Sequence, residues 1–276
     1  MSNPEGQAER NALRTNSCFD YWRFDMTGCA GTRWVVTGGT AGIGEAIVAE
    51  ARRRGAEVVT VARRESADVR ANLADASDVA GLVERIESEF GPVDVWVNNA
   101  GFDAVGAFVE STAQDVDDIF RLNLVTPIEL CRQIIPKMAA RGSGHVVNVS
   151  SMASSAAFSG MTLYAGTKAG LSNFHRVLRS EMRGSSVGLT IVEVGPIPTD
   201  MLDRAYDYPP TERGFRRLRR LQMMPEIRRE VVARGVVDGV LSGRRSVRFP
   251  RRAVIFPMIT SFPQRVVDLL VGSERP

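Results

Sequence analysis

A tyrosine and a lysine stand four residues apart in the stretch "YAGTK", which runs from Tyr164 to Lys168. Residues with this spacing share one face of a helix. A phenol has a pKa of about 10, and a nearby ammonium group lowers that pKa because it stabilises the phenolate. The pair therefore predicts proton transfer to or from a substrate oxygen. The plain alternative is a structural helix with a buried aromatic residue.

The lysine itself supports the chemical interpretation. The chain has 35 Lys and Arg residues, and only Lys137 and Lys168 are lysines. A lysine ammonium changes its pKa readily when it is buried, whereas an arginine guanidinium stays charged. A lysine at this position, in a chain that otherwise uses arginine, favours a role in proton chemistry.

Alternating strands and helices must position this pair. We expect strands at 33–37, 57–62, 67–73, 93–99, 144–150, 187–194 and 246–250, and helices at 42–55, 77–91, 112–140, 161–183 and 225–242, with Ser77 as an N-cap. Continuous apolar strands alternating with helices predict an α/β fold, a Rossmann-type doubly wound parallel sheet of about seven strands with helices on both faces. Ligands bind such a sheet at the carboxyl ends of its strands. Tyr164, which follows the fifth expected strand, is therefore predicted to lie at the ligand-binding edge.

A glycine-rich turn, "TGGTAGIG", joins the first expected strand to the first expected helix. Glycine lets the backbone approach a phosphate closely, and a helix N-terminus offers free N–H groups and a partial positive charge. This context predicts dinucleotide binding, although a tight packing turn would give the same pattern. The candidate cofactor-binding residues of the turn are Gly38, Thr40, Ala41, Gly42, Ile43 and Gly44.

The end of the second expected strand bears on the choice of cofactor. An acidic residue there would bind the ribose hydroxyl of NAD, whereas arginine would accommodate the additional phosphate of NADP. The sequence reads "TVARRES", with Ala62 at the place of the acid and Arg63 and Arg64 after it. Two guanidinium groups can hold a phosphate through charge-assisted hydrogen bonds. We therefore expect NADP(H) rather than NAD(H), and the alternative is a basic loop that faces water.

These features together resemble the short-chain dehydrogenase/reductase family over about residues 32 to 250. The shared motifs occur in the family's order: "TGGTAGIG", "NNAG" at 98–101, Asn123, Ser151, "YAGTK" at 164–168 and "VGPIPT" at 194–199. Ser151 lies thirteen residues before Tyr164, which is the family's spacing. That spacing selects Ser151 from the hydroxyl residues around it.

The resemblance implies a set of four catalytic residues. Tyr164 would be the general acid in reduction and the general base in oxidation, and Ser151 would polarise and position the substrate oxygen. Lys168 would lower the pKa of the tyrosine and hold the nicotinamide ribose. Asn123 would hold a water molecule that links the lysine to bulk solvent.

The resemblance also implies cofactor contacts outside the glycine turn. They would come from Asn99, Ala100 and Gly101 near the adenosine ribose, from Asn72 and Leu73 beside the adenine, and from Gly195, Ile197 and Thr199 at the nicotinamide, in addition to Tyr164 and Lys168. Two positions depart from the family's pattern. Val194 precedes Gly195 where the family usually has proline, and Asn72 stands where it often has aspartate. The helix usual between the second and third strands is also missing.

The expected activity is that of an NADP(H)-dependent oxidoreductase that transfers a hydride between nicotinamide and a carbonyl or secondary alcohol. The segment 196–224 would close over the substrate, and its apolar residues predict a hydrophobic steroid-, acyl- or terpenoid-like compound. These residues are Met201, Leu202, Tyr206, Tyr208, Phe215, Leu218, Leu221, Met223 and Met224. Two alternatives remain open. One is an inactive dinucleotide-binding sensor or scaffold, and the other is a peripheral-membrane or interaction protein that uses the basic C-terminal region.

Composition sets the remaining expectations. Residues 1–31 read as a flexible polar arm, 32–250 as the catalytic domain and 251–276 as an apolar, basic tail that could contact a membrane surface or a partner. No secretory signal and no spanning segment is expected, and three cysteines without metal-ligand spacing, Cys18, Cys29 and Cys131, favour a cytoplasmic protein without a metal. The arginine-rich stretch from Arg204 to Arg265 is expected to be a solvated helix surface and not a nucleic-acid site. His145 and His175 are expected to be structural. The resemblance suggests a homodimer or homotetramer built on helices 112–140 and 161–183.

Overall fold

The computed structural model describes residues 28–198, 200–220 and 225–250. In this part of the chain, seven strands form one sheet in the order β3-β2-β1-β4-β5-β6-β7, and every neighbouring pair is parallel. The strands are β1 (Arg33–Thr37), β2 (Glu57–Ala62), β3 (Val69–Arg70), β4 (Val95–Asn98), β5 (Gly144–Ser151), β6 (Val187–Val194) and β7 (Ser246–Phe249). This order confirms the predicted doubly wound sheet. The chain starts at a central strand, builds outward to β3, and then returns to build the other half.

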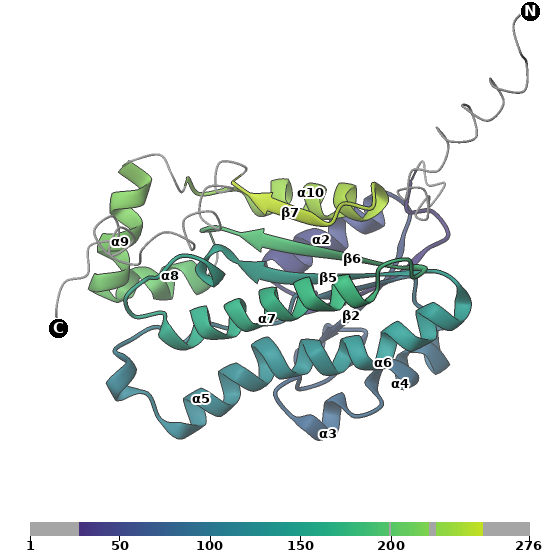
Figure 1. The fold of residues 1–276 in the computed structure, drawn as a ribbon, viewed down its shortest axis with the longest axis horizontal. Coiled ribbons are helices and arrows are strands. Elements are labelled where there is room, and N and C mark those ends of the chain that lie inside the picture. The colour runs from purple at the N-terminus through teal and green to yellow at the C-terminus, as the bar shows by residue number, and fades with distance from the viewer. Residues whose placement is uncertain (1–27, 199, 221–224, 251–276) are drawn as a thin grey trace, which may run out of the picture.

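Helices cover both faces of the sheet because its central strands are apolar on both sides. Helices α2 (Gly42–Arg53) and α10 (Arg229–Leu241) pack on one face. Helices α4 (Leu82–Phe90), α6 (Thr126–Arg141) and α7 (Thr162–Glu181) cover the other face. Figure 1 shows α6 and α7 running alongside each other below the strands, with α10 above them. Trp34 and Trp96 are fully buried, as expected: Trp34 packs in the core beneath α2 and α10, and Trp96 in the core beneath α4 and α6.

Two local predictions need correction. The third strand is only Val69–Arg70, much shorter than 67–73, and it pairs with just the last two residues of β2, Val61 and Ala62. The expected helix 77–91 divides into α3 (Ala76–Val79) and α4, because Gly81 between them adopts a left-handed φ of 65°. The N-cap of α3 is Asp75 and not Ser77. The Asp75 carboxylate accepts hydrogen bonds from both the backbone N–H and the hydroxyl of Ser77.

The expected long helix 112–140 consists of three consecutive segments. They are α5 (Ala113–Phe120), a single π-helical stretch (Arg121–Val125) and α6. Both prolines lie within α6, Pro127 near its start and Pro136 in its interior. The π-helical stretch carries Asn123, one of the predicted site residues. Such stretches are often found at functional sites.

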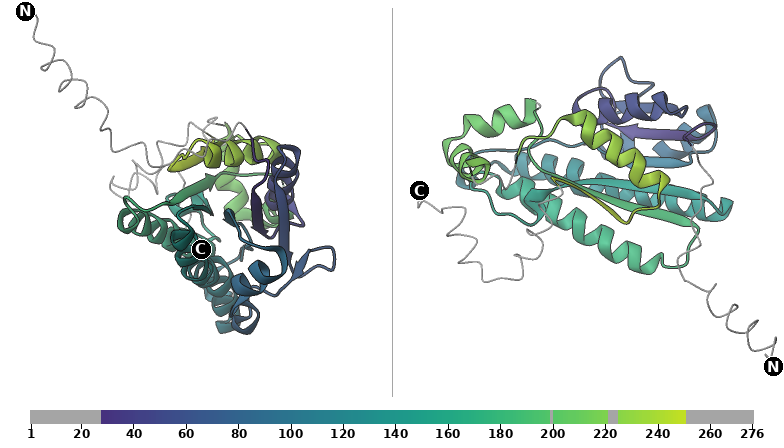
Figure 2. Two further views of the ribbon diagram at one scale, coloured as in Figure 1. Left: turned by 90° about the vertical axis from the view of Figure 1, so that its right-hand side faces the viewer. Right: turned by 90° about the horizontal axis from the view of Figure 1, so that it is seen from above.

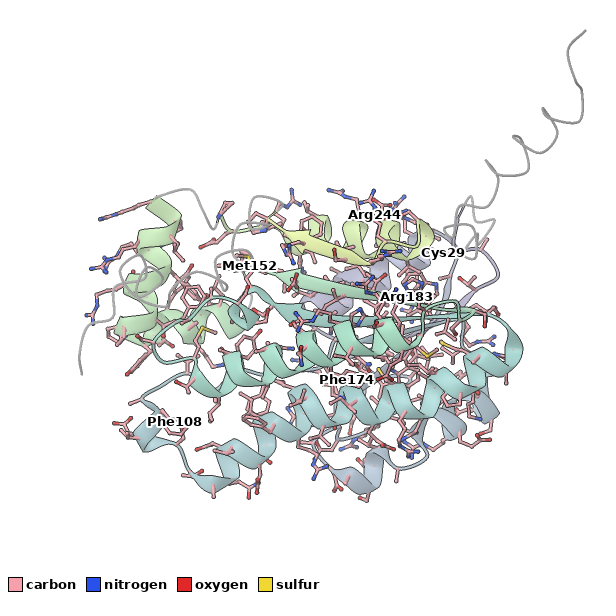
Figure 3. All side chains as sticks on the ribbon, in the orientation of Figure 1. Cys29, Phe108, Met152, Phe174, Arg183 and Arg244 are labelled. Atoms are coloured by element: carbon pink, nitrogen blue, oxygen red, sulfur yellow. The ribbon has the colours of Figure 1, made fainter. Side chains whose placement is uncertain are left out.

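At the carboxyl end of the sheet, the segment after β6 folds into α8 (Asp200–Asp207) and α9 (Pro209–Arg220). In Figure 1 the strand arrows point toward these two helices, and Figure 2 shows them at the same end when the molecule is seen from above. The short 3-10 helix Met152–Ser154 follows β5 at this end. Figure 3 labels Met152 there, with Arg183 and Arg244 toward the opposite end. The fold therefore brings α8 and α9 to the edge where ligands bind.

The ends of the chain differ in how far they can be described. Residues 28–31, which were expected to belong to a flexible arm, pack on the domain: Cys29 is fully buried and its N–H donates to the carbonyl of Arg54. The rest of the arm and the tail 251–276 lie outside the described residues. Among the helices that the structure describes, none is long and apolar enough to cross a membrane.

A buried polar network lies within the half of the core beneath α6 and α7. The Asn98 side chain donates to the Asn148 side-chain oxygen at 2.8 Å, and the Asn148 nitrogen lies 3.1 Å from His175 Nδ1. His145 Nε2 contacts the Thr190 hydroxyl at 2.8 Å. Burial lowers the pKa of His145 to about 3 and that of His175 to about 4. Both imidazoles are therefore neutral at pH 7, in keeping with the structural roles predicted for them.

Candidate active site

The glycine turn lies between β1 and the N-terminus of α2. Gly38 and Gly42 have positive φ values of 67° and 57°, a conformation that other residues rarely adopt. A Cβ atom on Gly44 would lie 2.2 Å from the carbonyl oxygen of Gly38, so only glycine fits there. The turn is thus folded so that the backbone itself forms its surface.

Neighbouring polar side chains hold this turn in place. The Thr37 hydroxyl accepts hydrogen bonds from the backbone N–H groups of Asn99 and Ala100, at 2.9 and 3.0 Å. The Asn99 amide in turn donates to the carbonyl of Thr37 at 2.9 Å. These bonds join the carboxyl ends of β1 and β4, so the structure brings together Gly38, Asn99 and Ala100, which the sequence separates by about sixty residues. Thr37 was not among the predicted residues, although it directly precedes the glycine turn.

The residues present fit a dinucleotide. No side chain caps the N-terminus of α2, where Ala41 is the N-cap, so the first backbone N–H groups of this twelve-residue helix remain available for an anion. Thr40 and Ile43 flank the N-terminus of α2 and are partly exposed. Ile43 also lines the main cavity of the protein, which it shares with Ser151 and Tyr164. An uncapped helix N-terminus beside a glycine backbone surface is a suitable site for a pyrophosphate.

Arg63 and Arg64 directly follow the carboxyl end of β2 and are both exposed. Residues 63–68 form bends and turns without a helix, as the short spacing predicted. Glu65 follows Arg64 directly and is exposed, and the next acid, Asp68, accepts hydrogen bonds from the N–H and the hydroxyl of Thr60, at 2.8 and 2.7 Å. Its carboxylate is therefore engaged in holding the β2–β3 turn.

Asn72 and Leu73 begin one residue beyond the end of β3, and their side chains have different surroundings. The Asn72 side chain is exposed and its oxygen accepts from the N–H of Ala74 at 3.3 Å. The Leu73 side chain is buried in the core, and its carbonyl accepts from the Thr126 hydroxyl at 2.7 Å. Of the two, only Asn72 presents its side chain to the surface beside the sheet edge.

Ser151 is the last residue of β5 and lines the main cavity. Its hydroxyl accepts from the N–H of Ala153 at 3.1 Å and lies 3.4 Å from the carbonyl of Val194. The neighbouring Ser150 hydroxyl is instead bound to α7, through Ser172 at 2.7 Å and the carbonyl of Lys168 at 3.1 Å. Because successive residues of a strand face opposite sides, the two serines have different partners.

Tyr164 and Lys168 lie on one face of α7 and are both buried, as their spacing predicted. Lys168 Nζ lies 5.7 Å from the centroid of the Tyr164 ring and donates a hydrogen bond to the carbonyl of Val149 at 3.1 Å. Both residues line the same cavity as Ser151. The structure thus brings the predicted serine, tyrosine and lysine together.

The pKa values depart from the sequence-based expectation. Burial raises the pKa of Tyr164 to about 12, with the charge of Asp103 acting in the same direction and a hydrogen bond with Ser151 acting against it. Burial also lowers the pKa of Lys168 to about 8. The pKa of Tyr164 is therefore raised where a lowering was expected, because desolvation of the phenolate is the largest effect on it.

Asn123 is fully buried and contacts the loop after β4. Its side-chain oxygen accepts from the N–H of Phe102 at 3.0 Å, and its nitrogen donates to the carbonyl of the same residue at 2.8 Å. A Cβ on Gly101 would lie 2.9 Å from the Asn123 oxygen and 3.5 Å from Lys168 Nζ, so Gly101 lies between them. Asn123 therefore anchors this loop beside the lysine.

The loop after β6 begins at Gly195, whose N–H donates to the carbonyl of Phe249 at 2.7 Å. A Cβ there would lie 3.1 Å from the sulfur of Met152 and 3.2 Å from Pro250. Ile197 is buried and, like Gly195, lines the cavity. The predicted contact of Thr199 lies outside the described residues.

The main cavity lies at the carboxyl end of the sheet. Its polar part contains Asn99, Ser151, Tyr164 and Lys168. Its apolar part comes from the loop after β5 and from α8 and α9, through Met152, Phe158, Met161, Leu202, Ala205 and Phe215. Phe158 and Phe215 meet edge to face, with ring centroids 4.8 Å apart. Of the nine apolar residues predicted for this role, Leu202 and Phe215 line the cavity, whereas Met201, Leu221, Met223 and Met224 have side chains outside the description.

The family model for the short chain dehydrogenase matches residues 33–208 of this sequence. That stretch covers more than half of the chain and includes the glycine turn and the Ser151, Tyr164 and Lys168 cluster. The chain belongs to the short-chain dehydrogenase/reductase family. The resemblance inferred from the motifs is therefore confirmed.

Relatives of this short-chain dehydrogenase/reductase agree with that assignment. Ketoacyl reductase HetN from Nostoc sp. is 31% identical over 187 residues, which span 60% of this chain and 64% of HetN, just under two thirds of that relative. A short-chain dehydrogenase from Streptomyces avermitilis superposes with a TM-score of 0.72 and 27% identity, over 87% of this chain and 96% of that one. A family member from Burkholderia phymatum, solved with NAD, has the same fold with a TM-score of 0.73 and 20% identity, over 91% and 99% of the two chains.

Asp103 is a cavity residue of this short-chain dehydrogenase/reductase that the sequence analysis did not identify. Its position offered one signal, because it follows the "NNAG" motif by two residues and therefore lies just beyond the carboxyl end of β4. An acid at that edge of a parallel sheet is a candidate for ligand contact.

Proposed function

We propose that this protein is an NADP(H)-dependent oxidoreductase that acts on a carbonyl group or secondary alcohol of a hydrophobic substrate. The observation that carries the proposal is the single cavity in which Ser151, Tyr164 and Lys168 meet an apolar wall from α8 and α9. A nicotinamide dinucleotide supplies or accepts the hydride when it is bound. The protein supplies orientation, exclusion of water and the proton.

Tyr164 is the proton donor in reduction. Because its pKa is about 12 in the buried site, its hydroxyl carries a proton throughout the neutral range. The Ser151 hydroxyl donates a hydrogen bond to the substrate oxygen and fixes it near the phenol. The Lys168 ammonium, 5.7 Å from the ring centroid, stabilises the phenolate that remains after the proton leaves. In oxidation the same groups act in reverse.

The glycine turn and the residues that support it would hold the cofactor. Gly38–Gly44 and the N-terminus of α2 would bind the pyrophosphate. Asn99, Ala100 and Gly101 would bind the ribose, and Asn72 would contact the adenine. Gly195, Ile197 and Thr199 would contact the nicotinamide. Asn123 anchors the loop that contains Gly101, which lies between Asn123 and Lys168.

The preference for NADP(H) rests on Arg63 and Arg64. Both are exposed at the carboxyl end of β2, where the adenosine ribose lies in this fold. The nearby carboxylate of Asp68 is occupied by Thr60. Asp68 is also paired with Arg52 at 3.7 Å, so among the nearby acids only the exposed Glu65 offsets the two arginines. A net positive charge at this strand end suits a ribose phosphate.

The substrate is hydrophobic because the cavity that Tyr164 lines has a wall of Phe158, Met161 and Phe215, with Leu202 and Ala205 from α8. Such a surface favours burial of an alkyl or fused-ring skeleton. HetN is named a ketoacyl reductase, which agrees with an acyl ketone as one compound of this kind.

A panel of hydrophobic ketones and secondary alcohols, assayed with NADPH and NADH through the absorbance of the reduced nicotinamide, tests the proposal. We expect turnover of at least one ketone, faster with NADPH at equal concentration. Dinucleotide binding without turnover of any compound would instead favour the sensor or scaffold. Binding to vesicles or a partner protein that disappears when residues 251–276 are removed would support the interaction protein.

A further inference from the structure

A buried carboxylate, Asp103, lines the same cavity and neither donates nor accepts the proton in the chemistry proposed above. Its side chain is 1% exposed. One oxygen, Oδ1, accepts hydrogen bonds from Arg204 Nη2 at 2.8 Å and Nε at 3.2 Å. The other oxygen, Oδ2, is buried and has no hydrogen-bond partner among the described residues.

An unpaired oxygen on a buried carboxylate is unfavourable, since it has lost its water and gained no donor. Buried polar groups in folded proteins nearly always have partners, and an exception requires an explanation. Asp103 lines the same cavity as Ser151 and Tyr164. A substrate bound beside Ser151 and Tyr164 therefore occupies the cavity that Asp103 also lines. A ligand donor is therefore the simplest partner for Oδ2.

The carboxylate is held in a fixed position from two sides. Asn123 makes two hydrogen bonds to the backbone of the preceding residue, Phe102, at 3.0 and 2.8 Å. Arg204 reaches Asp103 from α8, on the other side of the cavity. A group anchored in this way is preorganised to bind a ligand, because little side-chain freedom is lost on binding.

We propose that Asp103 is a specificity residue whose Oδ2 accepts a hydrogen bond from a hydroxyl group of the substrate. The substrate is then a hydrophobic ketone that carries a second, alcoholic oxygen away from the reacting carbonyl, or the corresponding diol. This inference rests on the proposed function, since it names the substrate class of the same site.

The charge of the site favours a neutral hydroxyl over other donors. Arg204 is already paired with the carboxylate through Oδ1, which offsets the negative charge that would attract an ammonium group. A substrate carboxylate or phosphate near Oδ2 would be repelled by its lone pairs. A hydroxyl group supplies one donor, which is what one unpaired oxygen can use.

The competing explanation is that the Asp103–Arg204 pair only fastens α8 to the loop after β4. The two explanations predict different behaviour of the two partners. A fastening role depends equally on both residues, whereas recognition of a hydroxyl group depends on the carboxylate and much less on the guanidinium.

The test measures binding of methyl nonyl ketone and of its derivatives with one hydroxyl at successive carbons, by titration calorimetry on the full chain, with and without NADP. We expect at least one derivative to bind the native protein about tenfold tighter or more than the parent ketone. Asp103→Ala should abolish this preference, whereas Arg204→Ala, which leaves the acceptor in place and removes one of its two anchors, should reduce the preference without abolishing it. Asp203→Ala, at an exposed position of α8, controls for the loss of one negative charge from this region.

Three results would overturn the proposal: no derivative preferred by the native protein, the same preference in Asp103→Ala, or a stronger preference for the matching amine. Tyr164→Phe separates this inference from the proposed function. It should keep the hydroxyl preference in binding, because the readout needs no turnover. A preserved preference in a native protein that reduces no ketone would contradict the proposed activity and leave the recognition by Asp103 standing.

Discussion

Lys168 Nζ lies 5.7 Å from the centre of the Tyr164 ring and makes its hydrogen bond to the carbonyl of Val149. The two residues are thus neighbours on one helix face without a direct bond between their polar atoms in the described structure. Burial opposes charge on both, so the pKa of the phenol is raised to about 12 and that of the amine lowered to about 8. The neutral phenol and the charged amine therefore coexist below about pH 8.

The first prediction concerns the charge of Lys168. Because its pKa is lowered to about 8, the ammonium group loses its proton as the pH rises through that value. Because Lys168 would hold the nicotinamide ribose, we expect the affinity for NADPH, measured by fluorescence titration, to fall above about pH 8. The Lys168→Met variant should not show this decline. Lys137→Met is the matched control, since the other lysine pairs with Glu84 and Glu87 on the surface. A decline that persists in Lys168→Met would show that another group is responsible.

The second prediction concerns the proton donor. Tyr164→Phe removes the hydroxyl and leaves the ring in its core contacts, so the fold and the cofactor affinity should remain. Ketone reduction, followed through NADPH absorbance, should fall by about a hundredfold to ten-thousandfold, which is the usual contribution of a positioned acid. Normal turnover in this variant would remove Tyr164 from the mechanism.

The third prediction concerns cofactor choice. Arg63→Ala should weaken NADPH binding by about tenfold or more and change NADH binding little, because only NADPH carries the additional phosphate. Arg85→Ala, at an exposed arginine of α4 on the same half of the sheet, is the control. Both affinities can be measured by quenching of protein fluorescence. Equal losses for the two cofactors would contradict the NADP preference.

The fourth prediction concerns the glycine turn. In Gly44→Ala the new Cβ would lie 2.2 Å from the carbonyl oxygen of Gly38, so the turn must shift. We expect a loss of about 1–3 kcal/mol in the free energy of unfolding, measured with urea, together with weaker dinucleotide binding. Gly166→Ala is the control, because its Cβ would meet only Phe120 at 3.8 Å. That helix substitution should be neutral or stabilising by up to about 1 kcal/mol.

The fifth prediction concerns the buried histidines. The pKa of His145 falls from 6.5 to about 3 and that of His175 from 6.5 to about 4 on folding, so below about pH 6.5 the unfolded chain binds more protons than the folded one. The contribution of the two imidazoles to the free energy of unfolding is fully present above about pH 6.5. It should fall as the pH drops from about 6.5 to about 5, by up to about 1.4 kcal/mol per pH unit for each imidazole.

Urea unfolding at several pH values measures this slope. Above about pH 5 the carboxylate of Glu50, whose pKa is lowered from 4.5 to about 2, contributes little to it. His175→Gln should reduce the slope by about half, whatever its absolute stability. An unchanged slope in that variant would assign the pH dependence to other groups.

Most of the fold could be predicted from the sequence, because its signals are local. The boundaries of β1, β2 and β6 agree with the apolar runs, and Tyr164 and Lys168 share a face of α7 because helical spacing requires it. The predictions failed where the backbone conformation of single residues determined whether a helix continued. The left-handed Gly81 divides a helix that its apolar periodicity favoured, and the π-helical turn at Asn123 has no pattern of its own.

The sequence by itself determined the order of strands and helices, the glycine turn, and the serine, tyrosine and lysine whose spacing marks the family. Only the tertiary structure decided how these groups behave, since burial depends on segments far apart along the chain. It raised the pKa of Tyr164 where a lowering was expected, and it brought Arg204 from α8 to one oxygen of Asp103 and left the other without a donor. Such outcomes depend on desolvation and packing, which a local pattern does not contain.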